Sequence, residues 1–213
     1  RVLINLHGGA FSLGARTEGR LESIPVANVA RMRVVSVDYR QGPEHRFPAA
    51  SEDVATVYRA LLETFPAENV GIFGCSAGGL LGAESIAWFD AHGLPRPGAL
   101  GIFCAGAGRL LEGDSSVIAS AFRVPMPERG AIAYFDGVDL SDPLVTPLES
   151  PALLGRFPPT LLISGTRDFA LSAALVTHQR LVDAGVDADL HVFEGMGHFF
   201  FSDTGLPESR KAF

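Results

Sequence analysis

The chain of 213 residues, of which 47% are hydrophobic and 19% are charged, has the size and composition of one globular domain. Its formal net charge of -7, without any cluster of Lys and Arg, argues against nucleic acid and anionic membrane surfaces as partners. No apolar stretch approaches the roughly 20 residues that cross a bilayer, so we expect no membrane span.

Short apolar segments that favour β-structure alternate along the chain with helical stretches. The expected strands are residues 2–6, 34–39, 70–74, 99–104, 160–165 and 188–193, and the expected helices are residues 48–65, 77–92, 170–184 and a last one from about 207. Nearly continuous apolarity is typical of parallel strands that helices cover on both faces. The alternation therefore predicts an α/β fold, a mostly parallel sheet flanked by helices and joined by right-handed crossovers.

The stretch from about 109 to 157 interrupts this alternation, because it is longer than a crossover needs and rich in Pro, Asp and Ser. A loop of that length without structure of its own is uncommon in a globular domain. We therefore expect it to form a partial cap inserted into a single domain of residues 1–213.

Two cysteines, Cys75 and Cys104, lie in apolar segments at the ends of expected strands. Such positions favour two reduced, buried thiols over a disulfide. This expectation favours a reducing compartment, and thus a cytoplasmic location.

Reactive residues follow four of the expected strands. His7, Gly8 and Gly9 come after the first strand, Ser76 after the third, Asp168 after the fifth and His198 after the sixth. In open α/β sheets the chemistry collects at the carboxyl ends of the strands, so these residues are expected to meet at one edge.

The segment GCSAGG, residues 74–79, matches the G-x-S-x-G pattern of a nucleophilic serine. A tight turn from strand to helix leaves no space for side chains at Gly74 and Gly78, so that Ser76 projects from its tip. The helix that begins at Ala77 directs free N–H groups to the same place. The alternative is a glycine-rich turn in which Ser76 only caps the helix.

The segment LHGGAF, residues 6–11, offers the donors of an oxyanion hole, because two glycines let backbone N–H groups turn inward. We expect Gly8 and Gly9 to act together with the Ala77 N–H group. His7 is expected to shape the loop by hydrogen bonding and to take no part in proton transfer. An ordinary Gly-Gly turn is the alternative.

The general base is expected at His198, in a glycine-containing loop flanked by apolar residues. Asp168 lies after one strand and before a helix, and the order Ser, acid, His is that of one hydrolase fold. A carboxylate there orients the imidazole and stabilises its protonated form. A helix N-cap is the alternative for Asp168, and a structural role is the alternative for His198.

The segments HGGAF, VDYRQGPEHRFPAASEDV, GCSAGG, FDGVDLSDPLVTPL, GTRD and AGVDADLHVFEGMGHFF together resemble the hormone-sensitive-lipase-like esterases of the α/β-hydrolase fold. The resemblance covers nearly the whole chain, as one catalytic domain. It implies a carboxylic-ester hydrolase that forms an acyl-enzyme intermediate, prefers short- to medium-chain acyl esters, and needs no metal or organic cofactor. It also implies Ser76 as nucleophile, Asp168 as acid, His198 as base, and Gly8, Gly9 and Ala77 as oxyanion donors.

The chain departs from this family in three places. Ala10 stands where the family usually has a third glycine, and Cys75 stands where it usually has Asp, so a polar contact beside the nucleophile is expected to be missing. Family members also carry a helical cap and two strands ahead of the HGG strand. Because this chain enters that strand directly after Arg1, we expect the cap and the first strands to be lacking.

Several functions stay open at this point. An amidase or a serine peptidase uses the same triad, and hormone receptors of plants that resemble these esterases bind a ligand without turnover, although they lack the histidine present here as His198. The small-molecule partner is expected to be an ester, and self-association into a homo-oligomer stays open. Nucleotide and metal sites find no support, because no G-x-x-x-x-G-K-[ST] and no H-E-x-x-H motif occurs.

Overall fold

The computed structural model describes the whole chain except residues 109–110, 112, 122–131 and 213. The described part contains a parallel sheet of six strands in the order β2-β1-β3-β4-β5-β6. The strands are β1 (Val2–Leu6), β2 (Arg33–Val37), β3 (Val70–Cys75), β4 (Ala99–Phe103), β5 (Thr160–Gly165) and β6 (Ala188–Phe193). The predicted α/β class is confirmed, and the predicted strands agree with these to within two residues.

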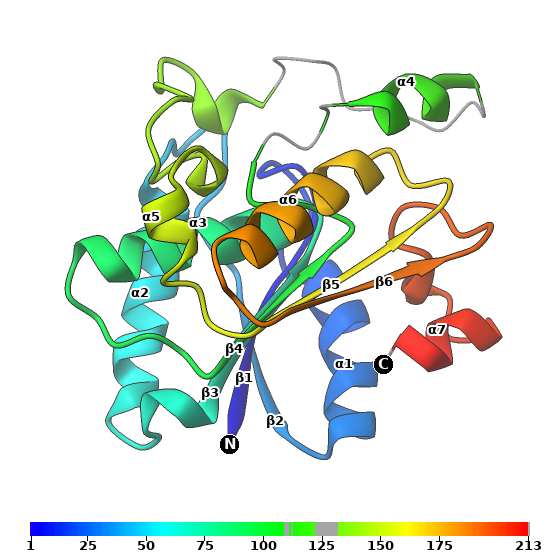
Figure 1. Cartoon of the computed structure of the whole chain (residues 1–213). Helices are drawn as coiled ribbons and strands as arrows, with labels where there is room; N and C mark the ends of the chain where they lie inside the picture. The colour runs from blue at the N-terminus through cyan, green and yellow to red at the C-terminus, as the bar shows by residue number, and fades with distance from the viewer. Residues whose placement is uncertain (109–110, 112, 122–131, 213) are drawn as a thin grey trace.

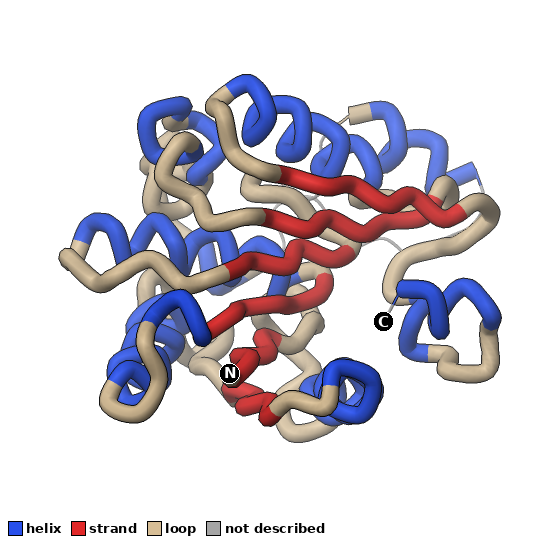
Figure 2. Tube along the Cα trace, turned by 60° about the horizontal axis from the view of Figure 1, so that its bottom comes forward, coloured by secondary structure: helices blue, strands red, loops and turns tan. Residues whose placement is uncertain are grey.

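Helices cover the sheet on both faces. Figures 1 and 2 show α1 and α7 on one side of the sheet, and α2, α3 and α6 on the other. The helices are α1 (Glu18–Ala30), α2 (Ala49–Leu62), α3 (Ala77–Ala91), α4 (Asp114–Ala121), α5 (Pro151–Leu154), α6 (Leu171–Asp183) and α7 (Pro207–Ala212). The arrangement confirms the predicted layers and puts the carboxyl ends of all six strands at one edge.

The coverage is not uniform across the sheet. β3, at the centre, is buried along its whole length, whereas β6 at one edge contains only partly buried and exposed residues. Val192 in β6 is 39% exposed. The expectation that helices cover both faces therefore holds for the central strands, and it fails at the edge, where a strand has a neighbour on one side only.

Helix α1 was not predicted. It contains Gly19 and Pro25, two residues that usually weaken a helix, and its apolar residues form no continuous stripe. Gly19 nevertheless fits closely where it lies, because a Cβ there would meet the Ser36 hydroxyl of β2. Close packing on β2 thus outweighs the poor local propensity, and it buries Glu22 on the inner side of the helix.

The segment expected to form a partial cap contains α4, α5 and two short 3-10 helices, Ala133–Phe135 and Pro147–Glu149. Tyr134 in the first of these is fully buried, stacks on Phe11 with ring centroids 4.7 Å apart, and its hydroxyl accepts the Ala50 N–H at 2.9 Å. The described part of this segment thus packs against the loop after β1 and the start of α2. That it is a cap stays a prediction, and residues 109–110, 112 and 122–131 lie outside the described residues.

Two further expectations concern the thiols and the membrane. Cys75 and Cys104 are both free and buried, which confirms the prediction of reduced thiols. Among the described residues, no helix combines the length and the apolarity that crossing a bilayer would require.

Candidate active site

The turn between β3 and α3 holds Ser76 in a conformation that L-residues rarely adopt, with φ 55° and ψ -121°. Its N–H donates to the Phe103 carbonyl of β4 at 2.8 Å. A Cβ at Gly74 or at Gly78 would collide with the carbonyl oxygen of Leu6 in β1. The prediction that this turn has no room for side chains on either side of the serine is confirmed.

The surroundings of Ser76 fit a reactive hydroxyl. Strained backbone of this kind costs roughly 1–3 kcal/mol and is concentrated at functional sites. The serine is partly exposed, whereas the residues that flank it, Cys75 and Ala77, are buried. Among the described residues the hydroxyl of Ser76 makes no recorded hydrogen bond, and neither does the Ala77 N–H that opens helix α3.

Asp168 and His198 meet at the same edge, although 30 residues separate them. The His198 Nδ1 atom lies 2.7 Å from the Asp168 Oδ1 atom. Because an ionised carboxylate only accepts hydrogen bonds, Nδ1 carries the proton and Nε2 keeps a free lone pair. The His198 ring also stacks on Phe169, with ring centroids 4.0 Å apart.

The Asp168 carboxyl is fully buried at its side chain but well supplied with donors. The Ser164 hydroxyl donates to Oδ2 at 2.8 Å, and the Ala170 N–H donates to Oδ1 at 2.9 Å. Burial by itself opposes the charged form, but the hydrogen bond and the charge of His198, with the two further donors, hold the pKa of Asp168 below its usual value. The carboxyl is therefore ionised at neutral pH.

The loop after β1 is held from below by aromatic and acidic side chains. The His7 Nδ1 atom donates to the Gly8 carbonyl at 2.6 Å, and the His7 ring stacks on Tyr39, whose hydroxyl donates to the His7 carbonyl at 2.7 Å. His7 is completely buried. This is the loop-shaping contact that the sequence analysis expected.

The Gly8 N–H group has a protein partner of its own. It donates to Glu22 Oε1 at 3.1 Å. Gly9, with φ 111°, and Ala10, with φ 52°, follow it, and no hydrogen bond to their N–H groups is recorded within the described part of the chain. Of the three expected oxyanion donors, Gly8 is thus engaged, whereas Gly9 and Ala77 are not.

Backbone strain collects at this edge of the sheet. Non-glycine residues with positive φ include Ala10 and Phe11 after β1, Ser76 after β3, Cys104 after β4 and Phe199 after β6. All of these except Cys104 occur in loops that carry candidate residues. Their distribution supports the interpretation of this edge as the functional one.

The two cysteines connect the serine turn to the histidine loop. The buried Cys75 and Cys104 side chains belong to one hydrophobic cluster, and Cys104 Sγ accepts the Phe199 N–H at 3.4 Å. Burial raises the pKa of both thiols, so neither is primed as a nucleophile. Ligand atoms of Cys104, Asp168 and His198 lie within 4.8 Å of one another, a grouping that a metal ion could use only by breaking the contacts just described.

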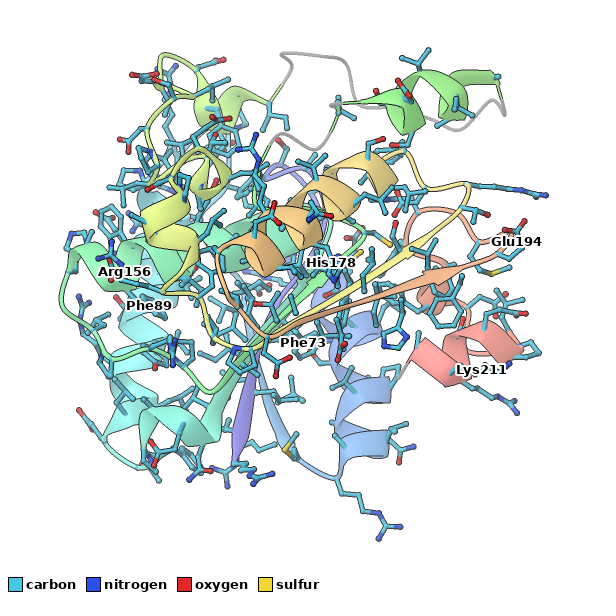
Figure 3. The ribbon with its side chains drawn as sticks, viewed as in Figure 1. Phe73, Phe89, Arg156, His178, Glu194 and Lys211 are labelled. Carbon is cyan, nitrogen blue, oxygen red and sulfur yellow. The ribbon has the colours of Figure 1, made fainter. Side chains whose placement is uncertain are left out.

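Two of the other histidines, His92 and His178, bind backbone carbonyls. His178 lies on α6, which covers the sheet (Figure 3), with Nε2 3.1 Å from the Ala188 carbonyl at the start of β6. The His92 Nδ1 atom lies 2.8 Å from the Trp88 carbonyl of its own helix. Their contacts are with backbone carbonyls, as expected for structural histidines.

Three side chains at this edge were not found from the sequence. Ser164 and Phe169 flank Asp168 in the chain, and this nearness was the only signal that could have indicated them. Glu22 carried a weaker signal, as a lone acidic residue in the apolar segment LESIPV. It was missed together with helix α1, because only the fold brings it beneath the loop after β1.

Comparison with known proteins supports one family. Residues 3–202 match the family described as alpha/beta hydrolase fold. An acetyl-hydrolase of Streptomyces hygroscopicus is 31% identical over 218 residues, which are 100% of this chain and 72% of that protein, and an esterase of Acinetobacter venetianus is 26% identical over 219 residues with the same coverage.

Solved structures agree with these relatives. The crystal structure of an esterase from the bacterial hormone-sensitive lipase family has a TM-score of 0.91 at 32% identity, and that of an esterase/lipase from an uncultured bacterium has a TM-score of 0.91 at 29% identity. Each comparison covers 100% of this chain and 73% of the other.

Proposed function

This chain belongs to the α/β-hydrolase fold family, as a hormone-sensitive-lipase-like esterase, and from this premise we propose that it hydrolyses short- to medium-chain acyl esters through Ser76, His198 and Asp168. The observation that carries the proposal is the 2.7 Å contact between His198 and a buried, ionised Asp168, at the sheet edge that also presents the strained Ser76. The chain is a carboxylesterase-type serine hydrolase, and we propose that the three residues act as its catalytic triad.

In the proposed reaction, His198 Nε2 takes the proton of the Ser76 hydroxyl while Oγ attacks the ester carbonyl carbon. The tetrahedral oxyanion accepts hydrogen bonds from the N–H groups of Gly9 and Ala77, both without a recorded protein partner in the described chain. The Gly8 N–H, which the sequence analysis placed in the same role, is bonded to Glu22 and is assigned to holding the loop.

Collapse of the intermediate breaks the ester C–O bond and leaves the acyl group on Ser76. The departing alkoxide takes the proton from His198 Nε2 and leaves as the alcohol. A water molecule then attacks the acyl-enzyme by the same steps, giving the carboxylic acid and free Ser76. Asp168 remains ionised throughout, because it accepts the Nδ1–H hydrogen bond and stabilises the imidazolium that forms twice in each cycle.

The first test is Ser76→Ala with a p-nitrophenyl ester of a short acyl chain. We expect a burst of p-nitrophenol from the unmodified protein and a loss of kcat on the order of 10⁴- to 10⁶-fold in the variant, because the nucleophile carries the covalent step. An organophosphate should add one equivalent to Ser76, to be located by mass spectrometry of the peptides.

Two controls separate the competing assignments. Cys75→Ala removes the neighbouring thiol and should leave the burst in place; a burst that disappears in Cys75→Ala and survives in Ser76→Ala would refute the assignment. Matched ester and anilide substrates should differ in kcat/KM in favour of the ester, and the reverse order would favour an amidase.

A further inference from the structure

Glu22 is a carboxylic acid buried beneath the loop that follows β1, with an exposed fraction of 1%. Its Oε1 accepts the Gly8 N–H at 3.1 Å, and its Oε2 accepts the Asn5 side-chain amide at 2.7 Å. The backbone of Cys75 also acts on this carboxyl, by lowering its pKa. Glu22 therefore holds the first residue of the glycine loop, Gly8, where that residue lies against the residue immediately before Ser76.

Gly8 lies in the loop after β1 and Cys75 at the end of β3, yet both positions serve one site. Gly8 precedes Gly9, the proposed oxyanion donor, and Cys75 is the last residue of β3 before the strained serine turn. A Cβ built on Gly8 would lie 3.3 Å from the Cys75 carbonyl and 3.6 Å from the Ser76 Cβ, which measures how closely the two segments approach. A shift of either would misalign donor and nucleophile.

We propose that Glu22 is a positioning residue for ester hydrolysis, whose buried carboxyl fixes the glycine loop against the serine turn. This role rests on the proposed function of the site. Asn5 in turn holds the acid: its Oδ1 accepts the Ser23 and Ser36 hydroxyls at 3.1 and 3.0 Å, so its amide N–H group is directed at Glu22 Oε2.

The charge state of Glu22 follows from its surroundings. Burial raises the pKa of Glu22 to about 8, against the opposing effect of the donors from Asn5 and Gly8, and the charge of Glu18 one turn earlier on α1 adds to the increase. The other titratable groups that face it are His7 after β1, Tyr39 after β2 and Cys75 at the end of β3. Burial keeps the pKa of Tyr39 and of Cys75 well above their usual values, so both stay neutral in this range.

Ionisation of Glu22 above pH 8 opposes catalysis. An ionised Glu22 places a negative charge beside the loop backbone that binds the oxyanion. The oxyanion is itself negative, and it exists only in the transition state and the intermediate. The loss therefore falls on kcat more than on KM. In the limit, kcat decreases about tenfold for each pH unit above the pKa of Glu22.

The test is the pH profile of kcat for the unmodified chain, Glu22→Gln and the matched variant Glu18→Gln. We expect the alkaline decrease to disappear in Glu22→Gln. In Glu18→Gln it should remain but move to lower pH, because the charge that helps to raise the pKa of Glu22 is gone. A decrease that persists unchanged in both variants would overturn the proposal.

A second measurement does not depend on catalysis. The ¹H–¹⁵N resonance of the Gly8 amide in the unmodified protein should shift with an apparent pKa near 8 and should move to lower pH in Glu18→Gln, even if Glu22→Gln fails to fold. If the protein is active but its Gly8 resonance does not change between about pH 7 and 9, the proposed role of Glu22 is refuted, whereas the proposed function of the site stands. If that resonance titrates but Ser76→Ala hydrolyses as fast as the unmodified protein, the proposed function fails and the contact of Glu22 with the loop stands.

Discussion

Two buried carboxyls lie at the same edge of the sheet, and their pKa values are shifted in opposite directions. Asp168, after β5, and Glu22, on α1, are each 1% exposed, and each accepts several hydrogen bonds. The pKa of Asp168 lies below its usual value, and that of Glu22 is raised to about 8. Burial and the number of donors are similar, so neither explains the difference.

The charge of the partners explains it. Asp168 pairs with His198, an imidazole that is 18% exposed at its side chain and can carry a positive charge. Among the described residues, Glu22 accepts hydrogen bonds only from neutral amides, and it lies near a second carboxylate, Glu18. A buried acid stays ionised where a cationic partner compensates the lost hydration, and it takes up a proton where none does. One edge of the sheet can thus hold an ionised carboxylate beside His198 and, beneath the glycine loop, a carboxyl whose pKa is raised.

The largest expected effect comes from removing the negative charge of Asp168 itself. Asp168→Asn should lower kcat about 10⁴-fold with a p-nitrophenyl ester, because the amide neither favours the productive His198 tautomer nor stabilises its protonated form. Ser164→Ala is the matched control: it removes one donor to the same carboxyl and should cost roughly tenfold. If Asp168→Asn kept kcat within tenfold, the contrast between the two carboxyls would have no catalytic meaning.

An intermediate effect is expected on the free energy of unfolding. The contribution of Glu22 to it decreases as the pH rises, and that of Asp168 decreases as the pH falls. The raised pKa of Glu22 means that the folded chain keeps a proton that the unfolded chain loses, so this contribution to stability decreases as the pH rises towards 8. The lowered pKa of Asp168 contributes stability at neutral pH that is lost on acidification.

Urea unfolding measured at several pH values, from about 5 to about 9, checks this prediction. The part due to Glu22 should change the free energy of unfolding by up to about 1.4 kcal/mol per pH unit. Glu22→Gln should flatten the decrease on the alkaline side and leave the acid limb unchanged. A variant as steep as the unmodified protein between pH 6 and 8 would exclude Glu22 as the source of the slope.

The smallest expected effect concerns backbone strain, which is greater in the loop on the Glu22 side. Gly9, Ala10 and Phe11 there have positive φ in succession, whereas Phe199 is the strained residue beside His198. Ala10→Gly should raise the free energy of unfolding by no more than about 1 kcal/mol. Glycine removes the strain of the left-handed conformation, but it loses more conformational entropy on folding, and the two effects nearly cancel.

The control for this variant is the same substitution at Ala60, an exposed residue within α2. Ala60→Gly should lower the free energy of unfolding by about 1 kcal/mol, because glycine is a poor helix former and no strain is relieved there. Thermal unfolding of both variants measures the difference, and a decrease in both would show that Ala10 is not strained.

Much of this molecule could be predicted from local pattern. Apolar segments between turn residues predicted all six strands. Because parallel strands end at a common edge, their order along the chain also predicted that Asp168 and His198 lie close together. The turn around Ser76 could be predicted as well, because its glycines are required by the close approach of Leu6. Helix α1 could not, since Gly19 is favourable only against β2.

The sequence by itself determined the order of the strands along the chain, the glycines around Ser76 and the reactive residues that follow the strands, because these depend on neighbours in sequence. Only the tertiary structure decided that the Gly8 N–H binds Glu22 and that Cys104 packs between the serine turn and the histidine loop. It also decided that the pKa of one buried carboxyl is lowered while that of the other is raised. A pKa depends on the charges and the solvent within a few ångströms, and residues far apart in the chain supply them.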